Sequence, residues 1–377
     1  MTASFRTRSR PALWLHRGKV IALETGAALL VASTASVFAK AYPAAVLLGL
    51  IAVLVIAAAF TRLQGRPLAD YVLRRTPPAP TRSSTSGLPG LVALSHSLPE
   101  LRIAEAEIHS GQTVGLLEDG QGFCAVLEIN TGGAIHLDLG LIAAQLAADP
   151  AEPSGVQLIV EQFRAPSPGE RFEPAGSYLG LSTPDDPLAR RVLLAVRHEP
   201  LWAPAAVTAR GGGASGAGKA VAAATARLRR HLDRTGVHAT MLAPRALYSV
   251  LAQLADSGRS GSARDHAWIT ENAAHCSLFA ELRSTSDLAR LVAAAAATPA
   301  DRSVVSVAVE LSGRMATTRA AVRVVSADHR RAAAARGALV ATGLVTTLPG
   351  HQADGLRATL PLGGGRRELI DALGVSR

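Results

Sequence analysis

After a basic arm of 19 residues, the chain carries two adjacent apolar runs, Val20–Phe38 and Ala41–Phe60, which are separated only by Ala39 and Lys40. Each run is long enough to cross a bilayer, because a helix rises about 1.5 Å per residue and the hydrocarbon core is about 30 Å thick. The second run holds no charged residue, and the first holds a single acid, Glu24. The pattern predicts a transmembrane hairpin of two helices, 20–38 and 41–60.

Two other interpretations of this segment are a cleavable signal peptide and a buried helical hairpin of a soluble domain. A signal peptide has one short apolar core followed by a small-residue cleavage site. Here a second uncharged run follows within two residues, and no polar domain lies between the two runs. The sequence therefore favours two membrane spans.

The distribution of charge predicts an orientation. Up to Arg82 the chain carries eleven basic and two acidic residues, whereas the whole chain has 39 basic and 29 acidic ones. By the positive-inside rule, the basic arm 1–19 and the juxtamembrane segment 61–90 are cytoplasmic. We therefore expect a multi-pass protein of the plasma (inner) membrane with both termini in the cytoplasm. The rest of the chain is nearly neutral, which argues against nucleic-acid binding despite a pI near 10.6.

A linker and a large domain follow the apolar runs. Thr76–Gly90 is rich in Pro, Ser and Thr and has no apolar period, which is typical of a linker. Residues 91–377 are numerous enough for a cytosolic domain with its own core. The two cysteines, Cys124 and Cys276, lie in apolar stretches. They are expected to be small buried hydrophobic residues and not reactive thiols.

Strand and helix patterns alternate along this domain. The similar order in its two halves predicts a mixed α/β fold, compatible with a duplicated α/β unit, although the residues show no self-match. Asp119-Gly-Gln-Gly122 is typical of a hairpin turn. The predicted strands are Thr113–Glu118, Phe123–Ile129, Val156–Phe163, Arg191–Arg197, Val237–Leu242, Cys276–Leu282, Val304–Leu311, Ala320–Val325 and Ala358–Leu362. The predicted helices are Leu141–Ala148, Gly218–Arg234, Pro244–Asp256, Ser286–Ala297 and Ala327–Ala341.

Gly213–Ala220 spells G-x-x-x-x-G-K, the start of a phosphate-binding loop, but ends in Ala220 where Ser or Thr would hold Mg²⁺. The preceding segment Pro200–Arg210 is broken by two prolines and looks partly helical, although such a loop needs a strand before it. We favour a flexible glycine-rich loop that opens the next helix. The alternative is a membrane-tethered nucleotide-binding regulator or enzyme that uses this stretch.

Metal and hydrolase patterns are weak. His266, Glu271, His275 and Cys276 lie close in sequence but lack the i, i+4 histidine pair of a zinc-binding helix. Adjacent residues of a strand point to opposite faces, so His275 and Cys276 could not readily bind one ion. The sequence therefore predicts no catalytic residues, no metal site and no cofactor.

The order of several motifs resembles the EccE family of actinobacterial type VII secretion systems. The motifs are the two apolar runs, the hairpin Val114–Ile129, the stretch Leu194–Gly213 with its Arg-Gly-Gly-Gly end, the Ala/Arg-rich run Ala220–Arg234, and Trp268 before the strand at 276–282. The resemblance implies a structural, non-enzymatic subunit of an export complex. It also implies partnership with the EccB, EccC and EccD subunits, of which EccC is the ATPase.

Candidate partner contacts follow from this resemblance. Arg210 with Gly211, Gly212 and Gly213 is expected to form a docking loop, and Trp268 is a further candidate. A carboxylate near a bilayer is costly unless it is paired or lies near the interface. Glu24 is therefore either an acid at the membrane interface or a contact to a basic group on a partner helix.

Overall fold

The computed structural model divides the chain into two compact units, Met1–Thr81 with Ile370–Arg377, and Arg82–Leu369. In the first unit, the described elements include helix α2 (Tyr42–Phe60) and the antiparallel pair β1 (Arg62–Leu63) and β2 (Arg66–Pro67). The described residues are 27–29, 31–34, 42–60, 62–63, 66–67, 94, 98, 100–108, 111–130, 137–163, 189–256, 261–282, 284–312 and 315–364.

The predicted transmembrane hairpin is wrong. No helix in the described part of the chain combines the length and the apolar character that a bilayer crossing demands. In the first apolar run, the helical residues that the structure describes are 27–29 and 31–34, well short of the roughly 20 residues that a crossing requires. The predicted multi-pass localisation in the inner membrane depended on this hairpin and is wrong with it.

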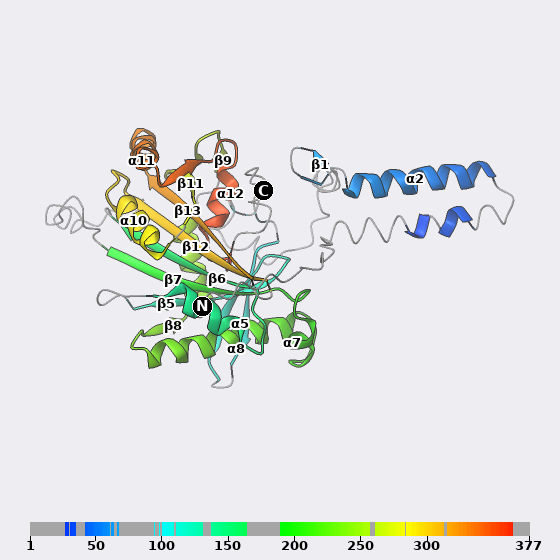
Figure 1. Ribbon diagram of the computed structural model, residues 1–377, viewed down its shortest axis with the longest axis horizontal. Coiled ribbons are helices and arrows are strands. Elements are labelled where there is room, and N and C mark those ends of the chain that lie inside the picture. Colours follow the sequence, from blue (N-terminus) through cyan, green and yellow to red (C-terminus); the bar gives the residue numbers. More distant parts are fainter. Residues whose placement is uncertain are drawn as a thin grey trace, which may run out of the picture. The chain divides into compact units, whose positions relative to one another are not determined.

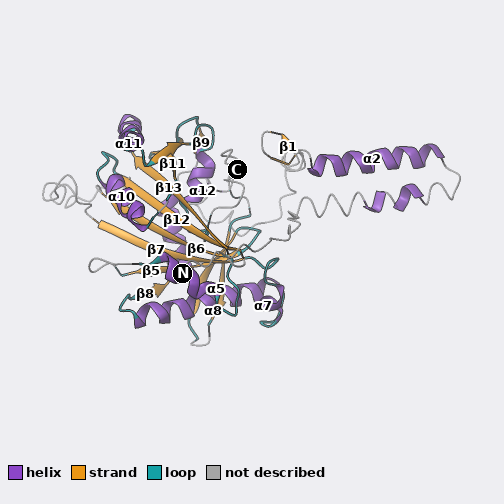
Figure 2. Ribbon diagram, in the orientation of Figure 1, coloured by secondary structure: helices purple, strands orange, loops and turns teal. Residues whose placement is uncertain are grey.

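A twelve-stranded sheet forms the framework of the Arg82–Leu369 unit (Figure 2). All neighbouring strands that the structure describes in it run antiparallel. The predicted mixed α/β class behind a membrane hairpin is therefore corrected to an antiparallel sheet with helices. The path is β3 (Arg102–Glu107), β4 (Thr113–Glu118), β5 (Phe123–Ile129), β7 (Ala189–His198), β6 (Gly155–Phe163), β12 (Arg302–Ser312), β13 (Met315–Ser326), β11 (Ala274–Ala280), β10 (Trp268–Thr270) and β9 (Gly261–Ala263), with β8 (Ala239–Met241) on β5 and β14 (Val345–Thr347) on β11.

Helices cover both faces of the sheet (Figure 1). Strand residues alternate between two cores, as Leu194 of β7 belongs to one and Leu193 to the other. The first core is closed by α5 (Leu139–Ala147), α8 (Gly213–Arg234), α10 (Thr285–Ala296) and α11 (His329–Ala341), and the second by α9 (Pro244–Ala255) and α12 (Gln352–Ala358). Burying each large apolar side chain stabilises the fold by about 1.5–3 kcal/mol.

The order of elements occurs twice. The order β3-β4-β5-α5-β6-β7-α8-β8-α9 recurs as β9-β10-β11-α10-β12-β13-α11-β14-α12, and the first half has the short helix α7 (Pro204–Thr208) in addition, between β7 and α8. In each half, the second hairpin strand pairs with two others: β5 with β7 and β8, and β11 with β13 and β14. The two hairpin turns are closed alike, because the side chains of Asp119 and Thr270 each accept hydrogen bonds from two backbone amides of their turn. The halves meet at the β6–β12 pair.

Most predicted strands and helices are confirmed within a few residues, but the final strand is not. Ala358–Leu362 contains the end of α12 and a turn. The carbonyl groups of Pro361 and Leu362 accept hydrogen bonds from Cys124 and Arg197, so they are not available to a strand partner. The predicted linker Thr76–Gly90 lies outside the described residues.

Candidate functional site

An exposed apolar corner follows the end of β7. Leu201 and Trp202 are 80% and 50% exposed, and they immediately precede the short helix α7 (Pro204–Thr208). The helix is anchored to the domain, because its own residues Ala206 and Val207 are buried. Pro204 stands at the first helical position, where its missing N–H costs nothing. Next to the anchored helix, the side chain of Leu201 is therefore mostly exposed and that of Trp202 is half exposed.

The predicted docking loop connects α7 to α8. Its three glycines have positive φ angles, 99° at Gly211, 73° at Gly212 and 60° at Gly213. Residues with a Cβ rarely adopt this backbone conformation, so the turn requires glycine. Arg210 is half-buried and donates from Nη1 to the carbonyl of Ala206 at 2.8 Å, which satisfies a carbonyl of α7.

The glycine stretch that resembles a phosphate-binding loop is helical. Helix α8 begins at Gly213, so the expected flexible loop over 213–220 is wrong. A Cβ at Gly216 would lie 2.5 Å from the carbonyl oxygen of Val207, and one at Gly218 would lie 2.9 Å from Cδ1 of Leu116. The glycines therefore allow α8 to pack closely against α7 and β4. From Gly216 onward the backbone amides donate to carbonyl groups of the helix, beginning with the Gly216 amide to the Gly212 carbonyl at 2.9 Å, so this stretch does not form a loop that wraps a phosphate.

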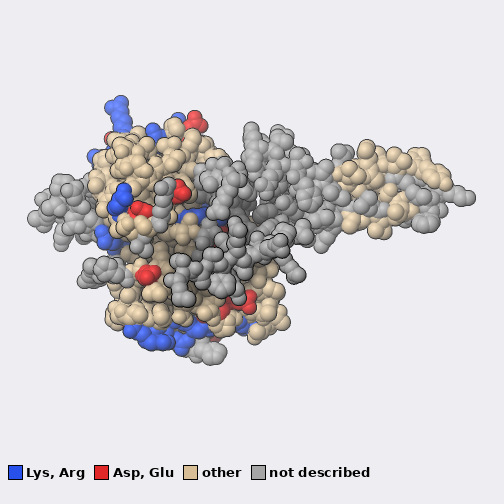
Figure 3. All heavy atoms as spheres, in the orientation of Figure 1, with Lys and Arg blue, Asp and Glu red and all other residues tan. Residues whose placement is uncertain are grey.

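Basic side chains gather over the part of α8 that lies away from α7 (Figure 1 and Figure 3). The buried side of α8 includes Val221 and Leu228, which belong to the first core. Arg227 pairs with the buried Asp149 through two hydrogen bonds of 2.6 Å. The side chains of Lys219, Arg230 and Arg234 are exposed.

The other predicted contact residues lie elsewhere. Trp268 begins β10 and is 4% exposed, and a Cβ at Gly261 would lie 2.3 Å from its ring atom Cζ2. Glu24 lies outside the described residues. Partner contacts at Trp268 and at Glu24 stay predictions.

The cysteines are buried and free, as predicted. Burial raises the pKa of both thiols, so little thiolate forms at neutral pH. The Sγ of Cys124 donates to the carbonyl of Pro361 at 3.2 Å. Within the described ranges, no group of three or more His, Cys, Asp or Glu side chains could hold a metal ion.

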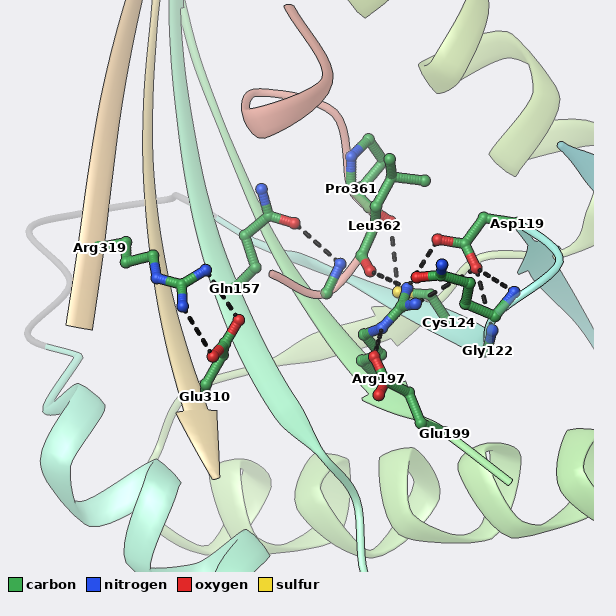
Figure 4. Close-up of polar contacts among 12 residues, drawn as sticks. Asp119, Gly122, Cys124, Gln157, Arg197, Glu199, Glu310, Arg319, Pro361 and Leu362 are labelled. Carbon is green, nitrogen blue, oxygen red and sulfur yellow. Dashed lines mark hydrogen bonds and ion pairs between the residues drawn. The ribbon is translucent and has the colours of Figure 1, made fainter. Parts of the chain in front are cut away.

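The sequence did not reveal the buried charges on the sheet face under α9 and α12. Arg197 of β7 donates from Nη1 to Asp119 at 3.0 Å and to the carbonyl of Leu362 at 2.9 Å, and from Nε to Glu199 at 2.7 Å (Figure 4). Burial alone would lower the pKa of Arg197, but Asp119 and Glu199 raise it by more than burial lowers it. The net shift is upward, so the guanidinium stays charged. This cluster fastens the chain after α12 to the first hairpin.

A second buried cluster lies at the end of α9. Glu161 of β6 accepts from Nε of Arg191 at 2.8 Å and from Nη1 of Arg302 at 3.2 Å. His275 of β11 lies 3.3 Å from the Asp256 carboxylate. The only available signal was polar residues at alternate positions of otherwise apolar strands, as at Glu161 in Val-Gln-Leu-Ile-Val-Glu-Gln.

Comparison with known proteins places the exposed corner within a family segment. Residues 187–286 match a family model described as "EccE: Putative type VII ESX secretion system translocon, EccE". The matched segment runs from β7 through α7, the triple-glycine turn and α8 to β11. No curated protein matches the chain. The resemblance to the EccE family of type VII secretion systems, inferred from the order of motifs, is thus confirmed over residues 187–286.

Proposed function

We propose that this protein is a structural, non-enzymatic component of a type VII secretion complex that docks other subunits through the corner formed by Leu201, Trp202 and the turn Arg210–Gly213. The observation that carries the proposal is the exposure of Leu201 and Trp202 beside a turn that only glycines can form, inside the EccE segment. The partners are the EccB, EccC and EccD subunits that the family resemblance implies.

The physical argument concerns the cost of exposing these side chains. Large apolar side chains that are exposed next to one another are typical of binding surfaces, and Leu201 and Trp202 are neighbours in the chain. Tryptophan is among the residues that contribute most to protein interfaces, because it buries a large area with few rotatable bonds. The exposed basic side chains of α8, from Lys219 in its second turn to Arg234 at its far end, supply charges that can steer an acidic partner toward this side of the domain. Buried cysteines and the helical Gly213–Ala220 support a role without catalysis.

Co-purification of the secretion subunits with the tagged full-length chain tests this function. Trp202→Ala is expected to weaken binding by about 2 kcal/mol, roughly 30-fold, and to reduce recovery of the partners. Leu141→Ser is the matched control, because Leu141 is also exposed, at 65%, but lies on α5 outside the EccE segment. Equal recovery of EccB, EccC and EccD with the Trp202 and Leu141 variants would refute the proposal.

A further inference from the structure

Two buried arginines converge on the carboxyl end of α9. Arg302 and Arg323 are 2% and 0% exposed, and they lie on the same face of the adjacent strands β12 and β13, where Val304 pairs with Arg323. Arg302 donates from Nη1 to the carbonyl of Gln253 at 2.6 Å, and Arg323 donates from Nη1 to the carbonyl of Leu254 at 2.7 Å. The last carbonyl groups of a helix lack partners within it and carry partial negative charge. They therefore orient both guanidinium groups.

Each of these arginines leaves one edge of its guanidinium unused. The Nε and Nη2 atoms of Arg302 and Arg323 are buried and have no hydrogen-bond partner among the described residues. Two other arginines show what this edge normally binds, because Arg191 and Arg227 direct Nε and Nη2 to the carboxylates of Glu161 and Asp149. A guanidinium edge with two parallel N–H groups matches two oxygens of an oxyanion.

The charges around this pair do not balance. Within the part of the chain that the structure describes, the cluster holds three guanidinium groups, of Arg191, Arg302 and Arg323, against two carboxylates, of Glu161 and Asp256. Neither carboxylate is within ion-pair distance of Arg323. Burial and the nearby charge of Arg302 lower the pKa of Arg323 to about 9, which still leaves it charged at neutral pH. Burying an unpaired charge is costly unless an opposite charge joins it.

His275 does not supply the missing negative charge. Its Nδ1 lies 2.9 Å from Nη1 of Arg323, which can only donate, so Nδ1 must accept and the proton resides on Nε2, facing Asp256. The ring is therefore a neutral acceptor. Four N–H-bearing atoms on two neighbouring cations remain available for an anion.

We propose that the free edges of Arg302 and Arg323 bind a small oxyanion, of the phosphate, sulfate or carboxylate class, at the carboxyl end of α9. Such an anion satisfies the unpaired N–H groups in the way that Glu161 satisfies Arg191, and it neutralises the excess positive charge. All four donor atoms are out of contact with solvent, so an anion reaches them only when the side chains packed around them move apart, and it exchanges slowly once bound.

Thermal unfolding of the full chain with inorganic phosphate, sulfate or acetate, at constant ionic strength set by chloride, tests this site. We expect one of these anions to raise Tm by several degrees in a saturable manner. Arg323→Lys and Arg302→Lys keep the positive charge but remove the two-donor edge, so each should abolish the rise. Arg230→Lys, on the exposed face of α8, is the matched control and should retain it.

A second measurement covers an anion that remains bound through purification. Dialysed protein is unfolded, and the released anions are quantified by ion chromatography. About one oxyanion per chain is expected from the wild type and the Arg230→Lys variant, and none from the Arg323→Lys or Arg302→Lys variants. A Tm rise that is equal in wild type and both of these lysine variants, or the absence of both a rise and a released oxyanion in the wild type, would overturn the proposal.

Discussion

The buried histidine of β11 makes the stability of this protein depend on pH in a calculable way. Burial lowers the pKa of His275 from 6.5 to about 4, and the Asp256 carboxylate, 3.3 Å from Nε2, only partly offsets this shift. The unfolded chain therefore takes up a proton first as the pH falls. Stability from the neutral ring is fully present above pH 6.5 and is lost as the pH decreases from 6.5 to 4. The linkage amounts to about 2 kcal/mol lost by pH 5 and about 3 kcal/mol by pH 4.

Urea unfolding at pH 7 and pH 5 checks this loss. Replacing His275 with Gln removes the titrating group while keeping one acceptor and one donor for its neighbours. The variant should lose about 2 kcal/mol less free energy of unfolding between the two pH values than the wild type. His238→Gln is the control, because the His238 side chain is 76% exposed. Wild type and His275→Gln with equal pH dependence would refute the reasoning. The pKa of Asp256 is also lowered, because its neighbours outweigh the burial that raises it. The stability that this shift contributes is lost only below pH 3.8, outside the interval between pH 7 and pH 5.

Two further predictions concern stability at neutral pH. Arg197→Met leaves Asp119 buried without its cation and should lower the free energy of unfolding, measured with urea, by about 3–5 kcal/mol. Arg331→Met is the control, because it removes a half-exposed ion pair and should change this free energy by less than about 1 kcal/mol. Similar losses in the two variants would contradict a stabilising role for the buried pair Arg197–Asp119. Gly216→Ala should lower Tm, because the added Cβ would clash with the backbone of α7. Gly337→Ala is the control: the space around this helical glycine is open, so alanine should raise the stability by about 0.5–1 kcal/mol. A gain at both positions would show that α7 and α8 do not pack closely.

The strands were predictable where the pattern was local. Thr113–Glu118 and Phe123–Ile129 were found from β-branched and apolar runs around a glycine-rich turn, and they form β4 and β5. Gly213–Ala220 was misjudged because glycine usually disfavours helices. The structure shows why glycine is used there: α7 and β4 approach too closely for a side chain.

Among the site residues, too, some were predictable from the local sequence and others were not. Arg210–Gly213 could be singled out by its composition, and the resemblance to EccE is confirmed across it. The exposure of Leu201 and Trp202 could not be predicted, because their composition alone suggests a core. The charges at Arg302 and Arg323 stand in strands that otherwise look buried, and no local pattern indicates what they contact.

By itself, the sequence determined the hairpin turns, the alternation of apolar residues in the strands and the order of the family motifs. These properties depend on residues that are neighbours in the chain. Only the tertiary structure decided that the halves join through antiparallel β6 and β12. It also decided that Arg323 meets the end of α9, 69 positions earlier in the chain. Such contacts depend on how distant elements pack around the two cores, and local patterns do not record that arrangement.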